Sequence, residues 1–305
     1  MSDILCIALN PTVDVSCEAE QVRHTFKVRT HNQRHDPGGG GINVARVVAE
    51  LGGSAEVIYL SGGATGALLD DCMEKTGLPR HNIVTEAPTR VSYMVREMLT
   101  ELEYRFVPEG LEINPASVEK VVERVAAFEG DYVVASGSLP QGLPDDTYAK
   151  IAESMRDAGT RFVLDTSGAA LQSALDAGGL FLIKPSIGEL QKLVGRRLDE
   201  DDAQNAAMNI VRGGGARYVA VSMGAEGAFL ASETGVLRLH ARRVNVQSAV
   251  GAGDSFVGAM VHSLAAGRDV EAAFRLGMAA GAAAVMTPGT QLCRRKDVEA
   301  LFDGR

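Results

Sequence analysis

The sequence lacks an excess of basic residues and lacks long apolar runs. Its 305 residues carry a net charge of −9, which argues against general nucleic-acid binding because that function usually needs a basic face. The first apolar run, 4–9, is too short for a signal peptide, and the longest later run, 278–286, is too short to span a bilayer. These absences predict a cytoplasmic protein with no nucleic-acid or membrane partner.

Cysteine is scarce as well, whereas glycine is abundant. The cysteines show no paired spacing, so the sequence predicts reduced thiols and neither a zinc site nor a disulfide framework. The 34 glycines fall largely in clusters, which indicates turns or places where the backbone closely approaches something else. Clustered glycines are a first indication of phosphate binding.

Two common nucleotide-binding loops are missing. No Gly-x-x-x-x-Gly-Lys-Ser/Thr segment occurs, so the chain is not a P-loop protein. The first apolar run leads into Asn10-Pro11-Thr12-Val13-Asp14 and not into Gly-x-Gly-x-x-Gly, which excludes the dinucleotide fingerprint. A nucleotide site in this chain must therefore use other loops.

Short apolar runs alternate with amphipathic stretches, which predicts a parallel sheet covered by helices on both faces. Strands are expected at residues 4–9, 56–60, 132–136, 162–165, 181–184 and 218–222. Helices are expected at 42–51, 66–76, 115–128, 145–158, 169–177, 187–194, 201–212, 253–266 and 270–286, with a short one after Arg294.

Two segments, about 13–35 and 89–107, alternate polar and apolar side chains without a helical period. They are expected to form antiparallel strands that flank the main sheet as a small lid. The apolar side of such a lid needs cover from substrate, core or a second subunit. With no repeat or linker in view, the chain is interpreted as one domain, 1–305, plus this lid.

The segment from Ser248 to Ser255 carries Gly251, Ala252, Gly253 and Asp254 at the start of an apolar helix. A helix start of small residues offers free backbone N–H groups and a partial positive charge to a phosphate or a developing oxyanion. Asp254 in the first turn can accept a hydroxyl proton beside that anion hole. The alternative is that Asp254 only caps the helix.

A second motif joins four glycines to Asn43 at the next helix start. Ordering consecutive glycines costs conformational entropy, which makes sense where the backbone touches a ligand. A flexible loop is the alternative. The glycines are Gly38, Gly39, Gly40 and Gly41.

Charged residues near the strand ends and in the lid extend this site. Asp14 follows the first strand, where parallel sheets place ligands, and binds sugar hydroxyls or serves as a turn residue. Arginine is the usual partner of a phosphomonoester, although it is also common on solvated surfaces. The basic residues of the lid are Lys27, Arg29, Arg90 and Arg105.

Two later strand ends suggest a nucleotide site, each with a plainer alternative. The segment from Ser222 to Gly227 is expected to bend around a nucleotide or to form a hairpin turn. Lys184 ends another strand, and Glu189 beyond it can orient magnesium through water or simply start a surface helix.

Together and in this order, these segments resemble the ribokinase-like, or pfkB, family of sugar kinases over essentially the whole chain. Further matching segments are 136–140 (Ser-Gly-Ser-Leu-Pro), 165–168 (Asp-Thr-Ser-Gly) and Lys184-Pro185. The resemblance implies a three-layer α/β/α sandwich with a mostly parallel sheet, a β-strand lid that forms a homodimer interface, and ATP with Mg²⁺.

Within that family the chain is most similar to the 6-phosphofructokinase branch. The branches that act on fructose 1-phosphate or tagatose 6-phosphate typically carry lysine inside the glycine motif, where this chain has Gly40. The segments 104–107 and 290–293 also resemble the 6-phosphofructokinase branch. The resemblance implies phosphorylation of fructose 6-phosphate at its C1 hydroxyl, a step of glycolysis. Kinases of the other two ketose phosphates, or a non-catalytic sugar or nucleotide sensor, are the alternatives.

The resemblance also assigns roles to residues. Asp254 becomes the base, and Gly251, Ala252 and Gly253 form the anion hole. The acceptor site contains Asp14, the four glycines, Asn43, Ser138 and the four basic lid residues. The ATP site contains Lys184, Ser186, Ser222, Gly224, Glu226 and Gly227, and Glu189 lies near magnesium. A potassium site is implied at Ser248, Val250, Ala284, Thr287, Gly289 and Gln291.

One residue departs from the family pattern. Ser186 stands where the family usually has asparagine, three residues before the glutamate. Serine is shorter and offers one hydroxyl in place of an amide, so contacts to metal or triphosphate are expected to run through water. The departure bears on the affinity for MgATP, because the base and the anion hole are unchanged.

Overall fold

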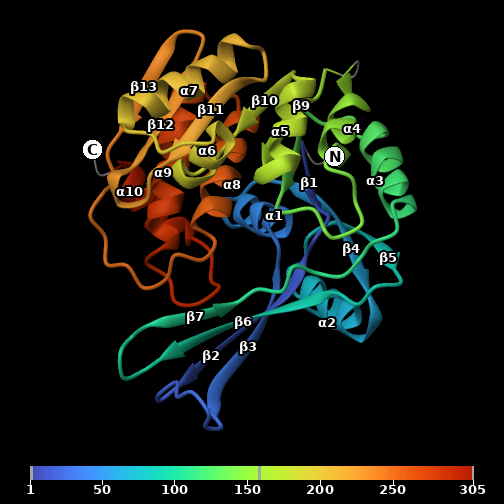
Figure 1. The fold of residues 1–305 in the computed structure, drawn as a ribbon, viewed down its shortest axis with the longest axis vertical. Helices are drawn as coiled ribbons and strands as arrows, with labels where there is room; N and C mark the ends of the chain where they lie inside the picture. Colours follow the sequence, from blue (N-terminus) through green and yellow to red (C-terminus); the bar gives the residue numbers. More distant parts are fainter. Residues whose placement is uncertain (1–2, 157–158, 304–305) are drawn as a thin grey trace.

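The computed structural model describes residues 3–156 and 159–303. Its large sheet has nine strands in the order β13-β12-β11-β10-β9-β8-β1-β4-β5 (Figure 1). The strands from β5 to β11 run parallel, and only the β11–β12 and β12–β13 pairs are antiparallel. The strands are β1 (Ile4–Ala8), β4 (Ala55–Gly62), β5 (Arg80–Thr85), β8 (Tyr132–Ser136), β9 (Arg161–Asp165), β10 (Leu180–Ile183), β11 (Ala216–Ser222), β12 (Ala228–Ser232) and β13 (Gly235–Leu239).

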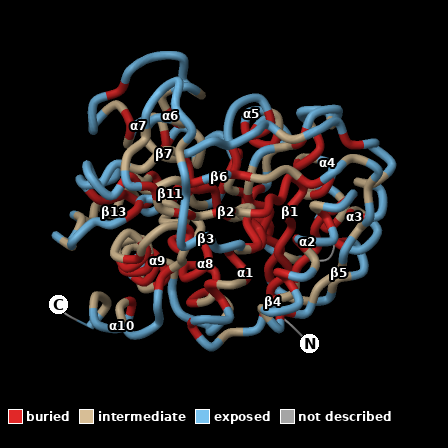
Figure 2. Tube along the Cα trace, turned by 90° about the horizontal axis from the view of Figure 1, so that it is seen from below, coloured by how far each residue is buried: buried red, intermediate tan, exposed pale blue. Residues whose placement is uncertain are grey.

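Helices cover both faces of this sheet. One face packs against α3 to α7 and the other against α1, α2, α8 and α9. Figure 2 shows the central strands as buried between these two layers. The helices are α1 (Gly40–Glu50), α2 (Gly63–Glu74), α3 (Ala116–Ala126), α4 (Thr147–Glu153), α5 (Gly168–Ala177), α6 (Ile187–Val194), α7 (Glu200–Arg212), α8 (Ala252–Ala265), α9 (Val270–Ala284) and α10 (Arg295–Asp303).

The strand composition explains why the parallel sheet lies in the middle. All five residues of β1 and all five of β8 are buried, so these strands are apolar without alternation. Strands of this kind need cover on both faces, which the two helical layers supply. The three-layer α/β/α architecture predicted from the sequence is confirmed.

The lid is a separate four-stranded sheet in the order β3-β2-β6-β7 (Figure 1). Its strands are β2 (Thr12–Ala19), β3 (Thr30–Gly38), β6 (Arg90–Glu97) and β7 (Glu103–Phe106). The expectation of purely antiparallel strands was wrong at one place, because the central pair β2–β6 runs parallel. The hairpin β2–β3 follows β1 and the hairpin β6–β7 follows β5, and the two hairpins lie side by side. The alternation of polar and apolar residues alone does not predict that the two hairpins pair in this way.

Other differences concern edges and ends. The strands β5, β12 and β13 were not expected. β5 and β13 are only half-buried and carry polar residues, whereas β12 is short but fully buried. The predicted helix 145–158 is observed as α4, which is shorter, and residues 157–158 lie outside the described part. None of the helices in the described ranges is long and apolar enough to cross a bilayer.

Candidate functional site

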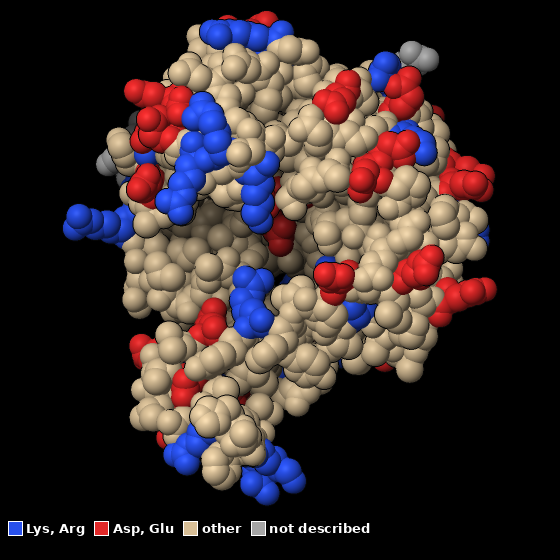
Figure 3. Space-filling view, in the orientation of Figure 1, with Lys and Arg blue, Asp and Glu red and all other residues tan. Residues whose placement is uncertain are grey.

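A cavity of about 170 Å³ lies between the lid and the carboxyl ends of the central strands. Figure 3 shows the hollow there, bordered by basic side chains. Lid strands, the glycine motif and the start of α8 all contribute to its walls. The lining residues are Thr12, Asp14, Gly39, Gly40, Asn43, Arg90, Ser92, Tyr93, Met94, Arg105, Val107, Val250, Gly251, Asp254 and Thr290.

Asp254 lies in the first turn of α8, as the sequence predicts. The N-cap position of this helix is Gly251, and Asp254 Oδ2 accepts a hydrogen bond of 2.8 Å from Asn43 Nδ2. Burial raises the pKa of Asp254, while the Asn43 hydrogen bond and the charge of Lys184 offset part of that rise. The geometry is that of a half-buried carboxylate that lines the cavity.

The start of α8 leaves room only for small residues. Gly251 has φ 71°, a conformation that glycine adopts without strain, and an added Cβ would lie 2.6 Å from Leu292. A Cβ on Gly253 would lie 3.4 Å from Lys184 Nζ, so this ammonium group reaches the same helix start. The free N–H groups of the helix and a buried lysine therefore face one region that suits an anion.

The glycine motif combines tight packing with exposure to the cavity. A Cβ on Gly38 would lie 2.1 Å from Asp14 Oδ2, and one on Gly41 would lie 2.1 Å from the carbonyl oxygen of Ile7. Only Gly39 and Gly40 line the cavity. Close packing explains all four glycines, because a Cβ on Gly39 would lie 2.9 Å from Pro11 Cα and one on Gly40 would lie 2.1 Å from Ser136 Oγ. Ligand access is a second reason for the inner two alone.

Asp14 lies on β2 at the wall of the cavity and is strongly perturbed. Burial and the negative charge of Asp254 raise the pKa of Asp14 to about 7, although Arg90 and Arg46 act in the opposite direction. An acid with this pKa is partly protonated near neutral pH, so it can donate as well as accept hydrogen bonds. Sugar hydroxyls are partners of that kind.

The structure brings two of the four basic lid residues to the cavity. Arg90 is held by the carbonyl oxygens of Asn10 at 2.7 Å and Pro108 at 2.8 Å, and Arg105 comes from β7. Ser138 is joined to this group because Asn10 Nδ2 donates to Ser138 Oγ at 3.1 Å.

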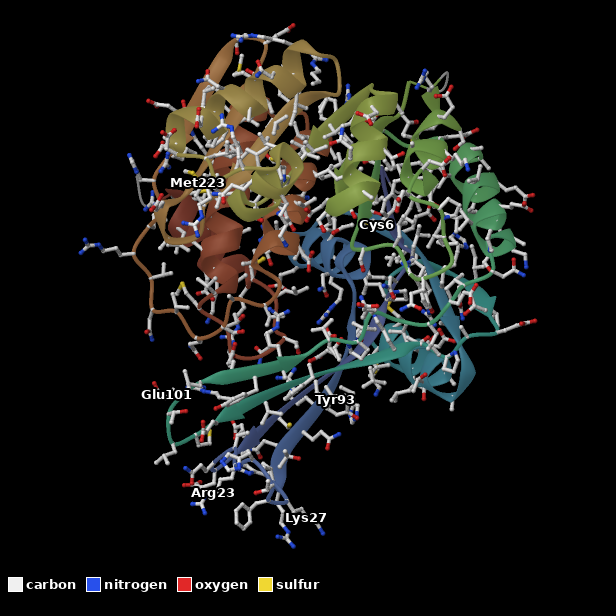
Figure 4. All side chains as sticks on the ribbon, in the orientation of Figure 1. Cys6, Arg23, Lys27, Tyr93, Glu101 and Met223 are labelled. Carbon is white, nitrogen blue, oxygen red and sulfur yellow. The ribbon has the colours of Figure 1, made fainter. Side chains whose placement is uncertain are left out.

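Lys27 and Arg29 do not reach this cavity in the single chain. Figure 4 shows Lys27 at the far end of the lid and Tyr93 near the cavity. Arg29 is exposed next to the outer end of β3, whereas Gly38 at the inner end touches Asp14. The nine residues of β3 place these ends roughly 25 Å apart. Neither of these two predicted basic residues therefore lies at the cavity in the single chain.

Lys184 forms a buried pair with a residue that the sequence analysis did not select. Lys184 Nζ lies 3.4 Å from Asp165 Oδ1, and both side chains are largely buried. Burial raises the pKa of Asp165 to about 6 even though Lys184 lowers it. Burial lowers the pKa of Lys184, but the charges of Asp165, Glu189 and Asp254 together raise it. Lys184 is thus a fixed cation beside the start of α8.

Ser186 and Glu189 form a capping box at the start of α6. The Ser186 N–H donates to Glu189 Oε2 at 2.7 Å, and the Ser186 hydroxyl donates to the same oxygen at 2.8 Å. The plainer alternative for this segment, a helix start, is therefore present in the structure. The cap uses Oε2 of Glu189, and serine is one of the residues that favour the N-cap position.

The segment from Ser222 to Gly227 joins β11 to β12, so it is also a hairpin connection. It contains a short 3-10 helix, Gly224–Glu226, and Arg238 Nη2 donates to the carbonyl oxygen of Glu226 at 2.9 Å. Ser222 and Ser186 form an isolated parallel bridge, which places the two predicted ATP-binding segments next to each other. None of the residues predicted to bind ATP lines the cavity that contains Asp254.

The segments predicted to bind potassium are held together before α8 and after α9. The N–H of Gln247 donates to the carbonyl oxygen of Val285 at 2.7 Å, and Thr287 Oγ1 bonds the carbonyl oxygens of Ala284 and Gln291, each at 2.7 Å. Neutral carbonyl and hydroxyl oxygens are the donors that suit a potassium ion. The donor set of Ser248, Val250, Ala284, Thr287, Gly289 and Gln291 is thus compatible with that ion.

Several residues of the site were not selected from the sequence. Asn10 links Arg90 to Ser138, and Arg46 Nη1 donates to Asn43 Oδ1 at 3.3 Å, which orients the asparagine. Ser136 lowers the pKa of Asp254 by hydrogen bonding. Asn10, Ser136 and Asp165 all lie at or just beyond the carboxyl ends of parallel strands, and that position was the available signal.

The chain is similar over nearly its whole length to proteins of known function. The ATP-dependent 6-phosphofructokinase isozyme 2 of Mycobacterium tuberculosis is 41% identical over 98% of this chain and 89% of its own length. The isozyme 2 of Escherichia coli is 37% identical over 99% of this chain and 98% of its own. The structure of the Escherichia coli phosphofructokinase-2 with fructose 6-phosphate superposes with a TM-score of 0.93 at 36% identity, covering 99% of this chain and 98% of that one.

The sequence pattern of the pfkB family of carbohydrate kinases matches residues 1–297. This match spans both the nine-stranded core and the lid, and it includes the glycine motif and the start of α8. The chain belongs to the pfkB family of carbohydrate kinases.

Proposed function

We propose that this chain transfers the γ-phosphoryl group of ATP to the C1 hydroxyl of fructose 6-phosphate, giving fructose 1,6-bisphosphate and ADP. The observation that carries the proposal is Asp254, a half-buried carboxylate at a helix N-terminus, in one cavity with Arg90 and Arg105. A base, an anion hole and a phosphate-binding pair are the groups that this reaction requires. The solved complex of the Escherichia coli relative with fructose 6-phosphate supports the choice of acceptor.

In this mechanism Asp254 takes the proton of the C1 hydroxyl. The C1 oxygen then bonds to the γ-phosphorus, and the oxygen between the β- and γ-phosphorus atoms leaves with ADP. The N–H groups of Gly251, Ala252 and Gly253 stabilise the charge on the transferred group, and Lys184 adds a positive charge beside Gly253. Catalysis of this kind consists mainly of positioning and electrostatics.

The acceptor site follows from the cavity walls. Asp14, Gly39 and Asn43 hold the sugar hydroxyls, while Arg90 and Arg105 bind the 6-phosphate. Gly40 supports this acceptor over fructose 1-phosphate and tagatose 6-phosphate. A Cβ added at Gly40 would lie 2.1 Å from Ser136 Oγ, so the lysine that is typical of the other branches does not fit at this position with this backbone. The 1-phosphofructokinases of Xanthomonas campestris and Bacillus subtilis are 31% identical to this chain.

ATP is proposed to lie along the carboxyl ends of β10 and β11, with Lys184 at its phosphates. Ser186, Ser222, Gly224, Glu226 and Gly227 surround it. No group of three or more acidic, histidine or cysteine side chains in the part of the chain that the structure describes could hold a metal ion. Magnesium would therefore bind together with ATP, and when bound it would neutralise phosphate charge. Glu189 would contact a water molecule on the magnesium ion through Oε1, because the capping box uses Oε2.

Potassium is proposed to bind the oxygens of the 248–250 and 284–291 segments. The Escherichia coli phosphofructokinase-2 has been solved in complex with potassium, and that structure superposes on this chain with a TM-score of 0.95. The role of these oxygens would be to shape the turn that precedes Gly251. The cation itself does not touch the reacting groups in this proposal.

The function is tested by comparing kcat/KM for fructose 6-phosphate, fructose 1-phosphate and tagatose 6-phosphate in an assay that measures ADP release. We expect fructose 6-phosphate to be preferred, with release that requires magnesium and increases when potassium replaces sodium. A higher kcat/KM for either other sugar would reassign the acceptor. Binding of sugar and ATP without any ADP release would indicate a sensor protein.

A homodimer through the lid is proposed because the lid carries large exposed apolar side chains. Phe26, Leu99 and Phe106 are 70%, 64% and 59% exposed in the single chain. Covering them with a second lid would also bring Lys27 of the partner subunit toward the sugar site. The Escherichia coli relative has a tetrameric inhibited form, so oligomers occur among the relatives.

Sedimentation equilibrium tests the lid interface. We expect the wild type to have twice the mass of one chain, and Phe106→Glu to shift the mass toward that of the monomer because a charge replaces an apolar contact. Val194→Glu, at an exposed apolar residue on α6, is the matched control and should stay dimeric. If Phe106→Glu remained dimeric, the interface would have to lie outside this part of the lid.

ATP is an intracellular substrate, and the four cysteines are buried and free, as in a reducing compartment. A cytoplasmic location is therefore part of the proposal. The acceptor would come from sugar metabolism in the same compartment.

A further inference from the structure

The lid touches the core through a carboxylate on its outermost strand, Glu103 of β7. Glu103 Oε2 accepts a hydrogen bond of 3.0 Å from Ser248 Oγ, which lies in the segment before α8. The other oxygen, Oε1, is buried and has no hydrogen-bond partner among the described residues. A buried carboxylate oxygen without a partner is costly, so stability alone does not explain this contact.

Ser248 links Glu103 to the segment that begins the anion hole through hydrogen bonds. Its hydroxyl donates to Glu103 and at the same time accepts the N–H of Val250 at 3.3 Å. Val250 lines the cavity and is followed directly by Gly251, the residue that begins α8. A chain of two hydrogen bonds therefore connects the lid carboxylate to the turn that presents the anion hole.

The same lid strand carries a ligand of the sugar phosphate. Arg105 lies two residues beyond Glu103, and alternate residues of a strand face the same side. Arg105 lines the cavity together with Asp254. A phosphate bound to Arg105 thus fixes the strand that also holds Ser248.

We propose that Glu103 is a positioning residue that couples binding of the sugar phosphate on the lid to the shape of the anion-hole turn. This inference rests on the proposed acceptor and extends it. Sugar phosphate at Arg105 seats β7 on the core, Glu103 orders Ser248, and Ser248 holds the N–H of Val250. ATP without the sugar meets a less ordered turn, which limits its hydrolysis by water.

Hydrogen exchange on the full-length protein tests the coupling without relying on turnover. In the wild type, fructose 6-phosphate should slow exchange both in the lid, 90–106, and in the turn, 248–256. In Glu103→Ala it should still slow exchange in the lid but no longer in the turn. Glu103→Gln keeps an acceptor oxygen for Ser248 and should restore protection of the turn.

Kinetics and stability complete the test. Glu103→Ala should lose up to about 10²-fold in kcat, the loss that a small misplacement of catalytic groups produces, with the KM for ATP unchanged. Glu101→Ala removes the same charge from the same hairpin, where Glu101 is exposed and pairs only with Arg96 at 3.8 Å, and it should behave as the wild type. Ser248→Ala should match Glu103→Ala, and the double variant should be no worse than either.

Protection of the turn by the sugar in Glu103→Ala, equal to that in the wild type, would overturn the proposal. The proposal would also be overturned if Glu103→Gln lost as much kcat as Glu103→Ala, or if the loss of kcat in Glu103→Ala were accompanied by a fall in Tm. Failure of the acceptor itself is distinguishable, because fructose 6-phosphate would then protect neither the lid nor the turn in the wild type.

Discussion

Asp254→Asn is expected to leave both substrates bound and to lower kcat on the order of 10²- to 10⁴-fold, the usual contribution of a general base. The amide that replaces the carboxylate cannot take the proton of the C1 hydroxyl. Its oxygen still accepts the hydrogen bond from Asn43 Nδ2, so the wall of the cavity keeps its shape. The loss should therefore appear in kcat and leave the KM for either substrate nearly unchanged.

The measurement is steady-state kinetics combined with calorimetric binding of fructose 6-phosphate and ATP. Asp201→Asn, at an exposed aspartate on α7, is the matched control and should retain full activity. Turnover of the Asp254→Asn variant within a few-fold of the wild type would remove Asp254 from the mechanism. Loss of sugar binding would instead assign it a binding role.

The pH dependence of the wild type gives a second view of the same carboxylate. Burial raises the pKa of Asp254, and the base must be deprotonated to act, so kcat/KM should fall toward acid pH. Asp14, whose pKa is raised to about 7 by burial and by Asp254, titrates with it. The acid limb therefore belongs to the pair of aspartates and not to one residue.

Much of this site was predictable because parallel sheets bring strand ends to one edge. Asn43 and Asp254 are 211 residues apart, at the starts of helices that follow the lid strand β3 and the antiparallel edge strand β13, yet they meet at 2.8 Å. The polar residues at strand ends could be selected on that rule alone. Which of these residues contact each other could not be predicted, because no single motif determines the order of the strands in the sheet.

The remaining differences have local causes. Ser186 and Glu189 satisfy the capping-box pattern, a signal present in the sequence that competes with a metal-binding interpretation. Gly38 is small because of Asp14, a contact that only the register of β2 with β3 creates. Lys27 is a different case, because it lies at the far end of the lid in the single chain and would reach the site only in the proposed dimer.

Arg90→Ala is expected to raise the KM for fructose 6-phosphate about 10- to 100-fold, the loss of one or two charge-assisted hydrogen bonds of about 1.5–3 kcal/mol in total. Arg90 already uses three N–H groups on the carbonyl oxygens of Pro11, Pro108 and Asn10. Since arginine has five N–H donors, two remain for the 6-phosphate. The KM for ATP should change little, because the proposed nucleotide site lies at another set of strand ends.

These same bonds also fix the base of the lid, so the loss of Arg90 must be separated from a loosened lid. Arg90→Lys keeps the charge but not the planar fork, and it should recover only part of the affinity. Arg96→Ala, on the same strand with Glu101 as its ion-pair partner, is the matched control and should leave both KM values unchanged. Equal increases in the KM for sugar and for ATP would count against a phosphate site at Arg90.

Lys27→Ala extends the comparison to the dimer. In one chain Lys27 lies at the far end of the lid, so a monomer gives it no route to the 6-phosphate. If two lids pack together, Lys27→Ala should raise the KM for fructose 6-phosphate as Arg90→Ala does. The effect should vanish in Phe106→Glu, because the monomer already lacks Lys27 of the partner subunit. An effect of Lys27→Ala that persists in the monomer would place the lysine in its own site and require a different lid conformation.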